Sequence, residues 1–280
     1  MQLDSAAIRA GVRLEAHDTL GSTNREALGR AGGPLWITAR RQTAGRGRRG
    51  RTWVSEPGNL YATLLLTDPG PAERAAELSF VAALAVRDAV IEMAPGLGLR
   101  LKVKWPNDLL IDRAKVAGIL IEGESAPDRP LAVAIGIGVN CLHNPSGTAY
   151  PATNLSAAGA AVSPDDLFAP LSRTMLQRLV QWARGAGFPS IRADWLNHAV
   201  GMGEDVHVVL GERALEGRFD RLDEAGHLVL RLRDGTTRTI AAGDVFPFAA
   251  LSEPHEAPGG PEARGRESAT TQPPNEANSA

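Results

Sequence analysis

Residues 101–140 decide the fold, and they read LKVKWPND at 101–108, KVAGILIE at 115–122 and LAVAIGIGVN at 131–140. Each segment is a largely apolar run of strand length, so we predict strands at Leu101–Trp105, Val116–Glu122 and Leu131–Asn140. The run Trp105-Pro106-Asn107-Asp108 has the residue types of a turn and places one after the first strand.

Lys115 and two glycines are unusual in such strands. Lys115 opens an apolar strand, so its charge either points into a binding site or marks a sheet edge, where lysine discourages aggregation. The residue pattern leaves both explanations open. Gly136 and Gly138 alternate in a buried strand, which suggests close approach of a ligand or of another backbone. They do not form the dinucleotide fingerprint, which needs three glycines in a strand-to-helix turn.

Helices and strands are expected on both sides of this stretch. A capping box at Thr23–Glu26 predicts a helix to about Arg30, and Ser163-Pro164 predicts the start of a helix that runs to about Ala183. The other expected elements are a short helix before a strand at 12–15, strands at 36–39 and 60–66, an amphipathic helix from Pro71 to Met93, and a helix at 189–199.

The pattern changes after Gly203 to short alternating strands separated by turns. Strands are expected at 206–210, 214–222, 227–232 and 237–240, which predicts a small β-barrel. Beyond it the chain turns to Pro, Gly, Glu, Ser and Asn and cannot bury enough apolar surface to order itself. We therefore expect a catalytic domain at 1–202, a small domain at 203–250 and a disordered tail at 251–280.

Residues 40–53, here called the arginine loop, read RRQTAGRGRRGRTW. Glycine lets backbone amides approach a ligand closely, and arginine supplies forked donors for phosphate or carboxylate. A long loop inside a compact domain is often functional. The loop therefore favours an anionic ligand such as a nucleotide, although a nucleic-acid tail or a merely solvated loop has the same composition.

Composition narrows the class of protein. The 280 residues carry a net charge of −2, so no global attraction to nucleic acid or anionic membranes is expected. The single cysteine, Cys141, excludes an internal disulfide and fits a reducing compartment. The start has no signal-peptide pattern, and no apolar run has the length of a membrane helix. We expect a cytoplasmic protein that binds neither membrane nor DNA.

Six motifs occur in the order found in the biotin protein ligase family. They are GSTN at 21–24, Gln42 with GRGRRGR at 45–51 and Trp53, NLY at 59–61, KWPND at 104–108, KVAGIL at 115–120 and GVN at 138–140. The chain resembles this family from about Leu14 to about Phe248. The resemblance implies an α/β (α+β) catalytic domain with a mixed sheet, of the class II aminoacyl-tRNA-synthetase-like, biotin-lipoate ligase type, and a C-terminal SH3-like barrel. About 20 residues precede Ser22, which fits the enzyme-only class without a DNA-binding domain.

The resemblance implies that biotin is activated with ATP and Mg²⁺ to biotinoyl-5′-AMP. A lysine of the biotin carboxyl carrier domain of acetyl-CoA carboxylase, or of a related carboxylase, then accepts the biotin. Lys115, Arg48 and Asp108 are the implied catalytic residues. Biotin contacts are expected from Ser22, Thr23, Asn24, Gln42, Gly45, Arg46, Gly47, Arg48, Lys115 and Gly118. ATP contacts are expected from Arg46, Arg48, Arg51, Trp53, Asn107, Lys115 and Asn140.

Alternatives stay open at this stage. Ser22 and Thr23 could simply cap a helix. A lipoate or octanoate ligase shares the wider fold, but its acids lack the ureido ring that calls for polar side chains such as Thr23 and Gln42. A nucleic-acid-binding module would use the arginine loop and the barrel without nucleotide turnover. A homodimer is plausible, because relatives include monomers and dimers.

Overall fold

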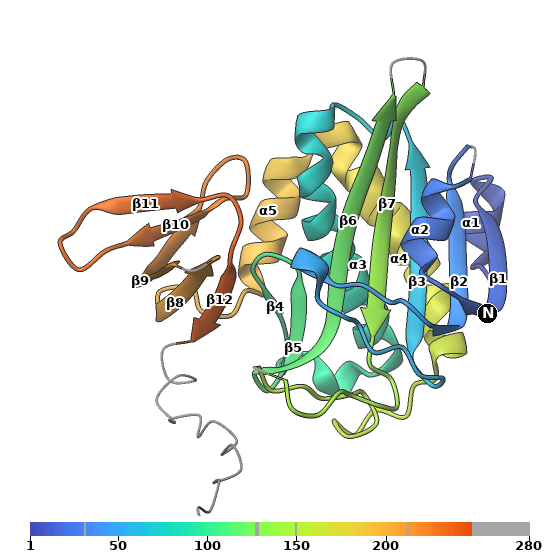
Figure 1. Ribbon diagram of the computed structural model, residues 1–280, viewed down its shortest axis with the longest axis horizontal. Helices are drawn as coiled ribbons and strands as arrows, with labels where there is room; N and C mark the ends of the chain where they lie inside the picture. Colours follow the sequence, from blue (N-terminus) through green and yellow to red (C-terminus); the bar gives the residue numbers. More distant parts are fainter. Residues whose placement is uncertain (31, 127–128, 149, 212, 248–280) are drawn as a thin grey trace, which may run out of the picture.

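The computed structural model describes residues 1–247 except 31, 127–128, 149 and 212. A mixed sheet of seven strands forms its centre, in the order β1-β2-β3-β7-β6-β5-β4 (Figure 1). The β1–β2 pair is parallel and the other described pairs of this sheet are antiparallel. This confirms the predicted α/β fold. The strands are β1 (Arg13–Leu20), β2 (Leu35–Gln42), β3 (Leu60–Thr67), β4 (Leu101–Lys104), β5 (Asp108–Ile111), β6 (Ala114–Ala126) and β7 (Arg129–Val139).

Helices cover both faces of this sheet. Successive side chains of a strand point to opposite faces, so neighbouring residues of β2 contact helices on opposite sides. On β2, Ile37 packs in a small cluster with Ala27 of α2. Its neighbour Trp36 meets Phe168 of α4 edge to face, with ring centroids 5.4 Å apart. The α-helices are α1 (Ser5–Arg9), α2 (Thr23–Leu28), α3 (Leu78–Met93), α4 (Pro164–Trp182) and α5 (Phe188–Asn197), with 3₁₀ turns at Arg48–Gly50, Ala72–Glu77, Pro95–Leu97 and Ala183–Gly185.

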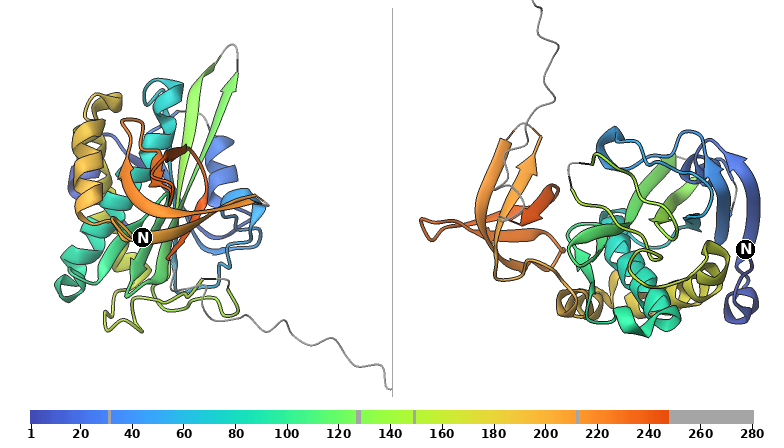
Figure 2. Two further views of the ribbon diagram at one scale, coloured as in Figure 1. Left: turned by 90° about the vertical axis from the view of Figure 1, so that its left-hand side faces the viewer. Right: turned by 90° about the horizontal axis from the view of Figure 1, so that it is seen from below.

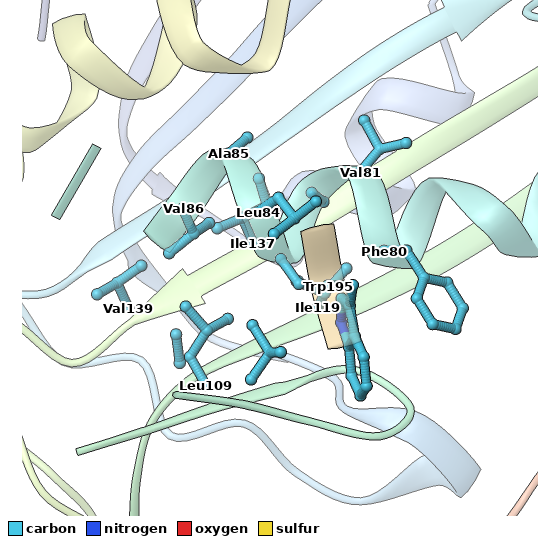
Figure 3. Packing of buried hydrophobic residues seen from close by; sticks show 14 of the residues in the cluster. Phe80, Val81, Leu84, Ala85, Val86, Leu109, Ile119, Ile137, Val139 and Trp195 are labelled. Carbon is cyan, nitrogen blue, oxygen red and sulfur yellow. The ribbon is translucent and has the colours of Figure 1, made fainter. Parts of the chain in front are cut away.

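The central helix differs from the expected amphipathic helix from Pro71 to Met93. A 3₁₀ turn occupies Ala72–Glu77, and α3 begins only at Leu78. Eleven of the sixteen residues of α3 are buried, since the helix lies between the sheet and helices α4 and α5. Figure 3 shows its side chains packed against Ile119 and Ile137 of the sheet and Trp195 of α5.

Two further predictions from the sequence were wrong in detail. The capping box fails, because Thr23 is the first residue of α2 and the N-cap, Ser22, makes no side-chain cap hydrogen bond. The polar side chains are used elsewhere, as described below. The sequence did not predict strand β5, which starts at Asp108. Residues 105–108 have the composition of a turn, and in the structure this turn leads directly into a strand that pairs antiparallel with β4. The cap at Ser163 is confirmed, since its hydroxyl accepts a hydrogen bond from the amide of Asp166 at 3.1 Å.

The C-terminal part is a five-stranded antiparallel sheet in the order β11-β10-β9-β8-β12, which confirms the expected SH3-like small domain. Figure 2 shows its strands curving around one another beside the larger sheet. The indole of Trp105 donates a 3.0 Å hydrogen bond to the carbonyl of Gly226 and joins the two sheets. The strands are β8 (Asp205–Leu210), β9 (Arg213–Leu222), β10 (Leu228–Arg231), β11 (Thr237–Ile240) and β12 (Asp244–Pro247).

The last of these strands, β12, had no counterpart among the expected strands. The expected tail at 251–280, and residues 248–250 of the expected small domain, lie outside the described residues. Within the described ranges, no helix combines the length and apolarity that crossing a bilayer requires.

Candidate active site

A cavity of about 390 Å³ opens between the arginine loop, the central strands and β12. All of the site residues predicted from the sequence line it, with the exception of Gly45. Gly45, itself part of the loop, packs closely against Trp53 and Ser55, because a Cβ atom there would clash with the carbonyl oxygen of Trp53 and lie 2.5 Å from the hydroxyl of Ser55. Glycine at this position therefore allows close packing within the loop, and a contact of Gly45 with biotin stays a prediction from the sequence.

A neutral hydrogen-bond network forms one part of the cavity wall. The carboxamide oxygen of Gln42 accepts from the amide of Thr23 at 2.9 Å and from its hydroxyl at 3.1 Å. The Gln42 amide nitrogen donates to Ser55 at 2.9 Å. Thr63 of β3 places its hydroxyl 2.8 Å from the Thr23 hydroxyl and 2.7 Å from the carboxamide oxygen of Asn24. Polar groups held in this way can both donate and accept.

Asn24 extends this network toward charged residues. Its amide nitrogen donates to Glu122 at 2.8 Å and to the carbonyl of Leu120 at 3.2 Å. Glu122 is also paired with Arg46 at 3.1 Å. The side chain of Asn24 lies directly over Gly136, where a Cβ would be 2.9 Å from its carboxamide carbon. This explains the first of the two alternating glycines, because a larger residue would displace Asn24.

The indole of Trp53 accounts for the second glycine. A Cβ at Gly138 would lie 2.6 Å from Trp53 Cε2, and one at Gly118 would lie 2.9 Å from Trp53 Cζ3. Gly118 and Gly138 are partners in the β6–β7 register. The two glycines therefore form a flat platform on which the ring lies. The ammonium of Lys115 stands over the same ring, 5.3 Å from its centroid.

A carboxylate between two lysines forms the charged part of the cavity. Asp108 Oδ1 lies 2.6 Å from the ammonium nitrogen of Lys115, and Oδ2 lies 3.2 Å from that of Lys104. Burial acts to raise the pKa of Asp108, but the two ammonium groups outweigh it and hold its pKa below the ordinary value. Asp108 is therefore ionised at neutral pH, and the group of three carries a net charge of +1.

Three arginines of the loop converge on Asp244 of β12. Arg49 and Arg51 lie 3.3 and 3.1 Å from its carboxylate, and Arg48 lies 3.6 Å away. Arg48 also donates to the carboxamide oxygen of Asn107 at 3.1 Å and to the carbonyl of Gly243 at 3.3 Å. Burial lowers the pKa of Arg48 despite Asp244, but a guanidinium remains ionised in proteins. The C-terminal sheet thus fixes the position of the loop.

Residues 141–148 and 150–163, here called the 141–163 loop, contribute the remaining side of the cavity through Pro145, Ser146, Thr148, Tyr150 and Ala152. The buried side chain of Asn140 donates to the carbonyl of Thr153 at 3.0 Å, and the backbone of Lys115 pairs with the loop through Pro151 and Thr153. The ring of Tyr150 lies 6.0 Å from that of Phe246 on β12. Burial, together with the nearby Asp108, raises the pKa of the Tyr150 hydroxyl to about 12.

Sequence reasoning missed four residues that line the cavity, Lys104, Tyr150, Asp244 and Phe246, and the buried Thr63 that supports Thr23 and Asn24 from behind. Lys104 lies in the KWPND motif, but no role was predicted for it. The chain has only three lysines, and this scarcity could have marked Lys104 as a candidate site residue. Asp244 and Phe246 belong to a strand that the pattern did not predict. Asp244 meets Arg49 and Arg51 of the arginine loop across 195 and 193 positions of the chain, which no local sequence pattern reports.

The residues present do not form a dedicated Mg²⁺ site. The described part of the chain has no group of three or more metal-binding side chains, and the carboxylates lining the cavity, Asp108 and Asp244, already pair with basic groups. Mg²⁺ usually keeps several waters and is held by substrate phosphates with one or two carboxylates. A Mg²⁺ ion in this cavity would therefore need oxygen ligands from a bound phosphate group in addition to these side chains.

Comparison with known proteins decides the family. Residues 22–140 match the model of the biotin/lipoate A/B protein ligase family, and residues 201–246 match that of the biotin protein ligase C terminal domain. A biotin acetyl-CoA-carboxylase ligase of Paracoccus denitrificans is 42% identical over 237 residues, covering 80% of this chain and 96% of the relative. The chain belongs to the biotin protein ligase family.

Other members extend the comparison. The bifunctional ligase/repressor of Bacillus subtilis is 31% identical, over 86% of this chain and 78% of its own length. The biotin protein ligase of Aquifex aeolicus, solved with biotin and ATP, is 26% identical, with a TM-score of 0.70 over 84% of this chain and 97% of its own. This biotin protein ligase fold agrees with the mixed sheet and small C-terminal sheet described above.

Proposed function

We propose that the chain activates biotin with MgATP to biotinoyl-5′-AMP and transfers the biotin to a lysine of a carboxylase carrier domain. One observation carries this proposal. A single cavity holds a neutral pocket, formed by the hydrogen-bonded side chains of Thr23, Gln42 and Ser55, next to a cationic cluster, formed by Lys104, Asp108 and Lys115. Asn24 covers Gly136 and Trp53 covers Gly138, two positions along β7. A ligand lying along β7 would therefore meet Thr23 and Gln42 at one end and Lys115 at the other.

The neutral pocket suits a ureido ring. Such a ring has both donors and an acceptor, and the Thr23–Gln42–Ser55 network offers hydroxyl and amide groups that its neighbours already orient. Buried polar groups of this kind reject a ligand that lacks the matching polar atoms, because they would lose their partners on binding. The pocket thus favours biotin over lipoate or octanoate.

The cationic cluster suits the activation step. The carboxylate oxygen of biotin attacks the α-phosphorus of ATP, the bond to the bridging oxygen breaks, and pyrophosphate leaves with that electron pair. Both reactants are anions, so positive charge that is already in place lowers the barrier. Lys115 can swing from Asp108 toward the new bond, since its side chain is 28% exposed on the cavity side. Arg46 and Arg48 line the same cavity and would add positive charge on the phosphates.

The second step needs a neutral acceptor amine. An isolated lysine has a pKa of about 10.4 and is protonated at neutral pH. Asp108, ionised at that pH, would orient the incoming amine and accept its proton as nitrogen attacks the biotinoyl carbonyl and AMP leaves. Trp53, Asn107 and Asn140 line the cavity beside these groups and would contact the nucleotide.

Pyrophosphate release tests the proposal directly. The purified chain is given MgATP with biotin, lipoate or octanoate separately, in wild type and in Lys115→Ala. Release that depends on biotin and falls at least about 100-fold in the variant, the scale of removing one transition-state donor, would support it. Release with lipoate or octanoate instead of biotin would show that the chain is a lipoate or octanoate ligase. A folded protein that releases no pyrophosphate with any of these acids would overturn the proposal.

A further inference from the structure

Lys104 is the more deeply buried of the two lysines in the charged part of the cavity, since its side chain is 7% exposed and that of Lys115 is 28% exposed. The whole Lys104 residue is 5% exposed, and its ammonium donates to the carbonyl of Val245 at 3.1 Å. The rings of Tyr150 and Phe246 lie 4.9 and 5.7 Å from it. These contacts come from the 141–163 loop and from β12. They fix the charge of Lys104 in place, so it cannot turn toward a ligand as the more exposed Lys115 can.

The two lysines hold opposite oxygens of one carboxylate, Oδ2 for Lys104 and Oδ1 for Lys115. Asp108 is 8% exposed, and a buried carboxylate without a partner is strongly unfavourable. If Lys104 were absent, Lys115 would be the sole remaining lysine on Asp108. If Lys115 then moved to an anionic reactant, the buried carboxylate of Asp108 would have no lysine partner. The free-energy cost of that unpaired charge would oppose the movement of Lys115.

We propose that Lys104 is a positioning residue that neutralises Asp108 and thereby frees Lys115 to engage the reacting carboxylate and phosphate. Lys104 acts through Asp108 and touches no substrate in this scheme. The low pKa of Asp108, which reflects both ammonium groups, agrees with shared neutralisation. This inference rests on the proposed function, because Lys115 is assigned its task there.

A double-mutant cycle on pyrophosphate release tests this inference. Lys104→Met removes the charge while keeping an unbranched side chain, and Asp108→Asn removes the anion that restrains Lys115. We expect Lys104→Met alone to lower kcat for biotin-dependent release about 100-fold, the scale expected for stranding a buried charge. The KM for ATP should change little, because Arg46 and Arg48 still bind phosphate. In the Asp108→Asn background the same substitution should cost less than about threefold, since coupled sites are not additive.

Lys102→Met is the matched control. Lys102 lies two residues away on β4 and does not line the cavity, so its loss should leave release within about twofold of wild type, as for a surface substitution. Thermal unfolding checks that each variant is folded. If Lys104→Met does not fold, Lys104→Gln takes its place, because its amide can still donate to the carbonyl of Val245.

Three outcomes would overturn the inference while leaving the proposed function intact. They are an equal loss for Lys104→Met in both backgrounds, a loss confined to the KM for ATP, and a loss above about 100-fold for Asp108→Asn alone. By contrast, a wild-type chain without biotin-dependent release would overturn the proposed function itself. The two failures are therefore distinguishable within one set of assays.

Discussion

Replacing Gly138 by alanine should push Trp53 off its platform and slow the activation step. The new Cβ would lie 2.6 Å from Trp53 Cε2, whereas ordinary contact begins at 3.4 Å, so the ring must move by about 0.8 Å. The loop resists, because the amide of Trp53 donates to Gly45 at 3.0 Å and its carbonyl accepts from Ser55 at 2.9 Å. Overpacking of this kind costs about 1–3 kcal/mol of stability, and a loss of the same size from the transition state would lower kcat/KM roughly 5- to 150-fold.

Tryptophan fluorescence can follow this displacement. The other four tryptophans are at most 2% exposed, so acrylamide quenching in the native protein reports mainly on Trp53. We expect Gly138→Ala to raise the quenchable fraction and to lower biotin-dependent pyrophosphate release together. Gly123→Ala on β6 is the matched control, because its Cβ would meet nothing closer than 3.7 Å. If Gly138→Ala matched this control in both measurements, the platform argument would be refuted.

Three further predictions concern the loop, the polar pocket and pH. Arg48→Gly should loosen the arginine loop and release biotinoyl-5′-AMP, so streptavidin blots should show bystander labelling above wild type; equal labelling would contradict this. Thr23→Val should weaken biotin binding in calorimetry by about 1–3 kcal/mol, because Gln42 loses a buried donor, whereas Thr43→Val at the exposed strand end should not. Asp108 has a lowered pKa, so its stabilising effect is present above its unfolded pKa of about 3.9 and is lost as pH falls through the lower folded value. In denaturant titrations from pH 6 to pH 2, the stability difference between wild type and Asp108→Asn should therefore shrink at the acid end; a constant difference would contradict the assignment.

Much of the larger sheet could be predicted from the sequence, because each strand carries its own apolar pattern. The segments at 60–66 and 116–122 lie within β3 and β6, and all of the segment at 131–140 except Asn140 lies within β7. Long-range packing accounts for the errors. Helix α3 was expected to expose one face, but α5 covers part of it from a region about 100 residues away. Thr23 looked like a helix cap, yet its hydroxyl bonds to Gln42 and lies beside Thr63.

Residues that line the cavity were found from the sequence where they lie in short motifs and were missed where distant segments meet. The motifs around Lys115 and the arginine loop gave the residues of one wall. The wall from β12 could not be foreseen, because Asp244 is unremarkable in sequence and gains its importance from three arginines that the fold brings to it. A cytoplasmic location, a homodimer and the lack of DNA binding stay predictions from the sequence.

The continuous core has a consequence for how the chain melts. Buried residues of the small sheet, such as Val206 and Phe219, belong to the same apolar cluster as Trp105 and Leu109 of the larger one. The Trp105–Gly226 and Lys104–Val245 hydrogen bonds cross the same boundary. Neither sheet can lose its structure without exposing part of the core of the other. Calorimetry should therefore show one heat-absorption peak for both sheets, with equal calorimetric and van't Hoff enthalpies.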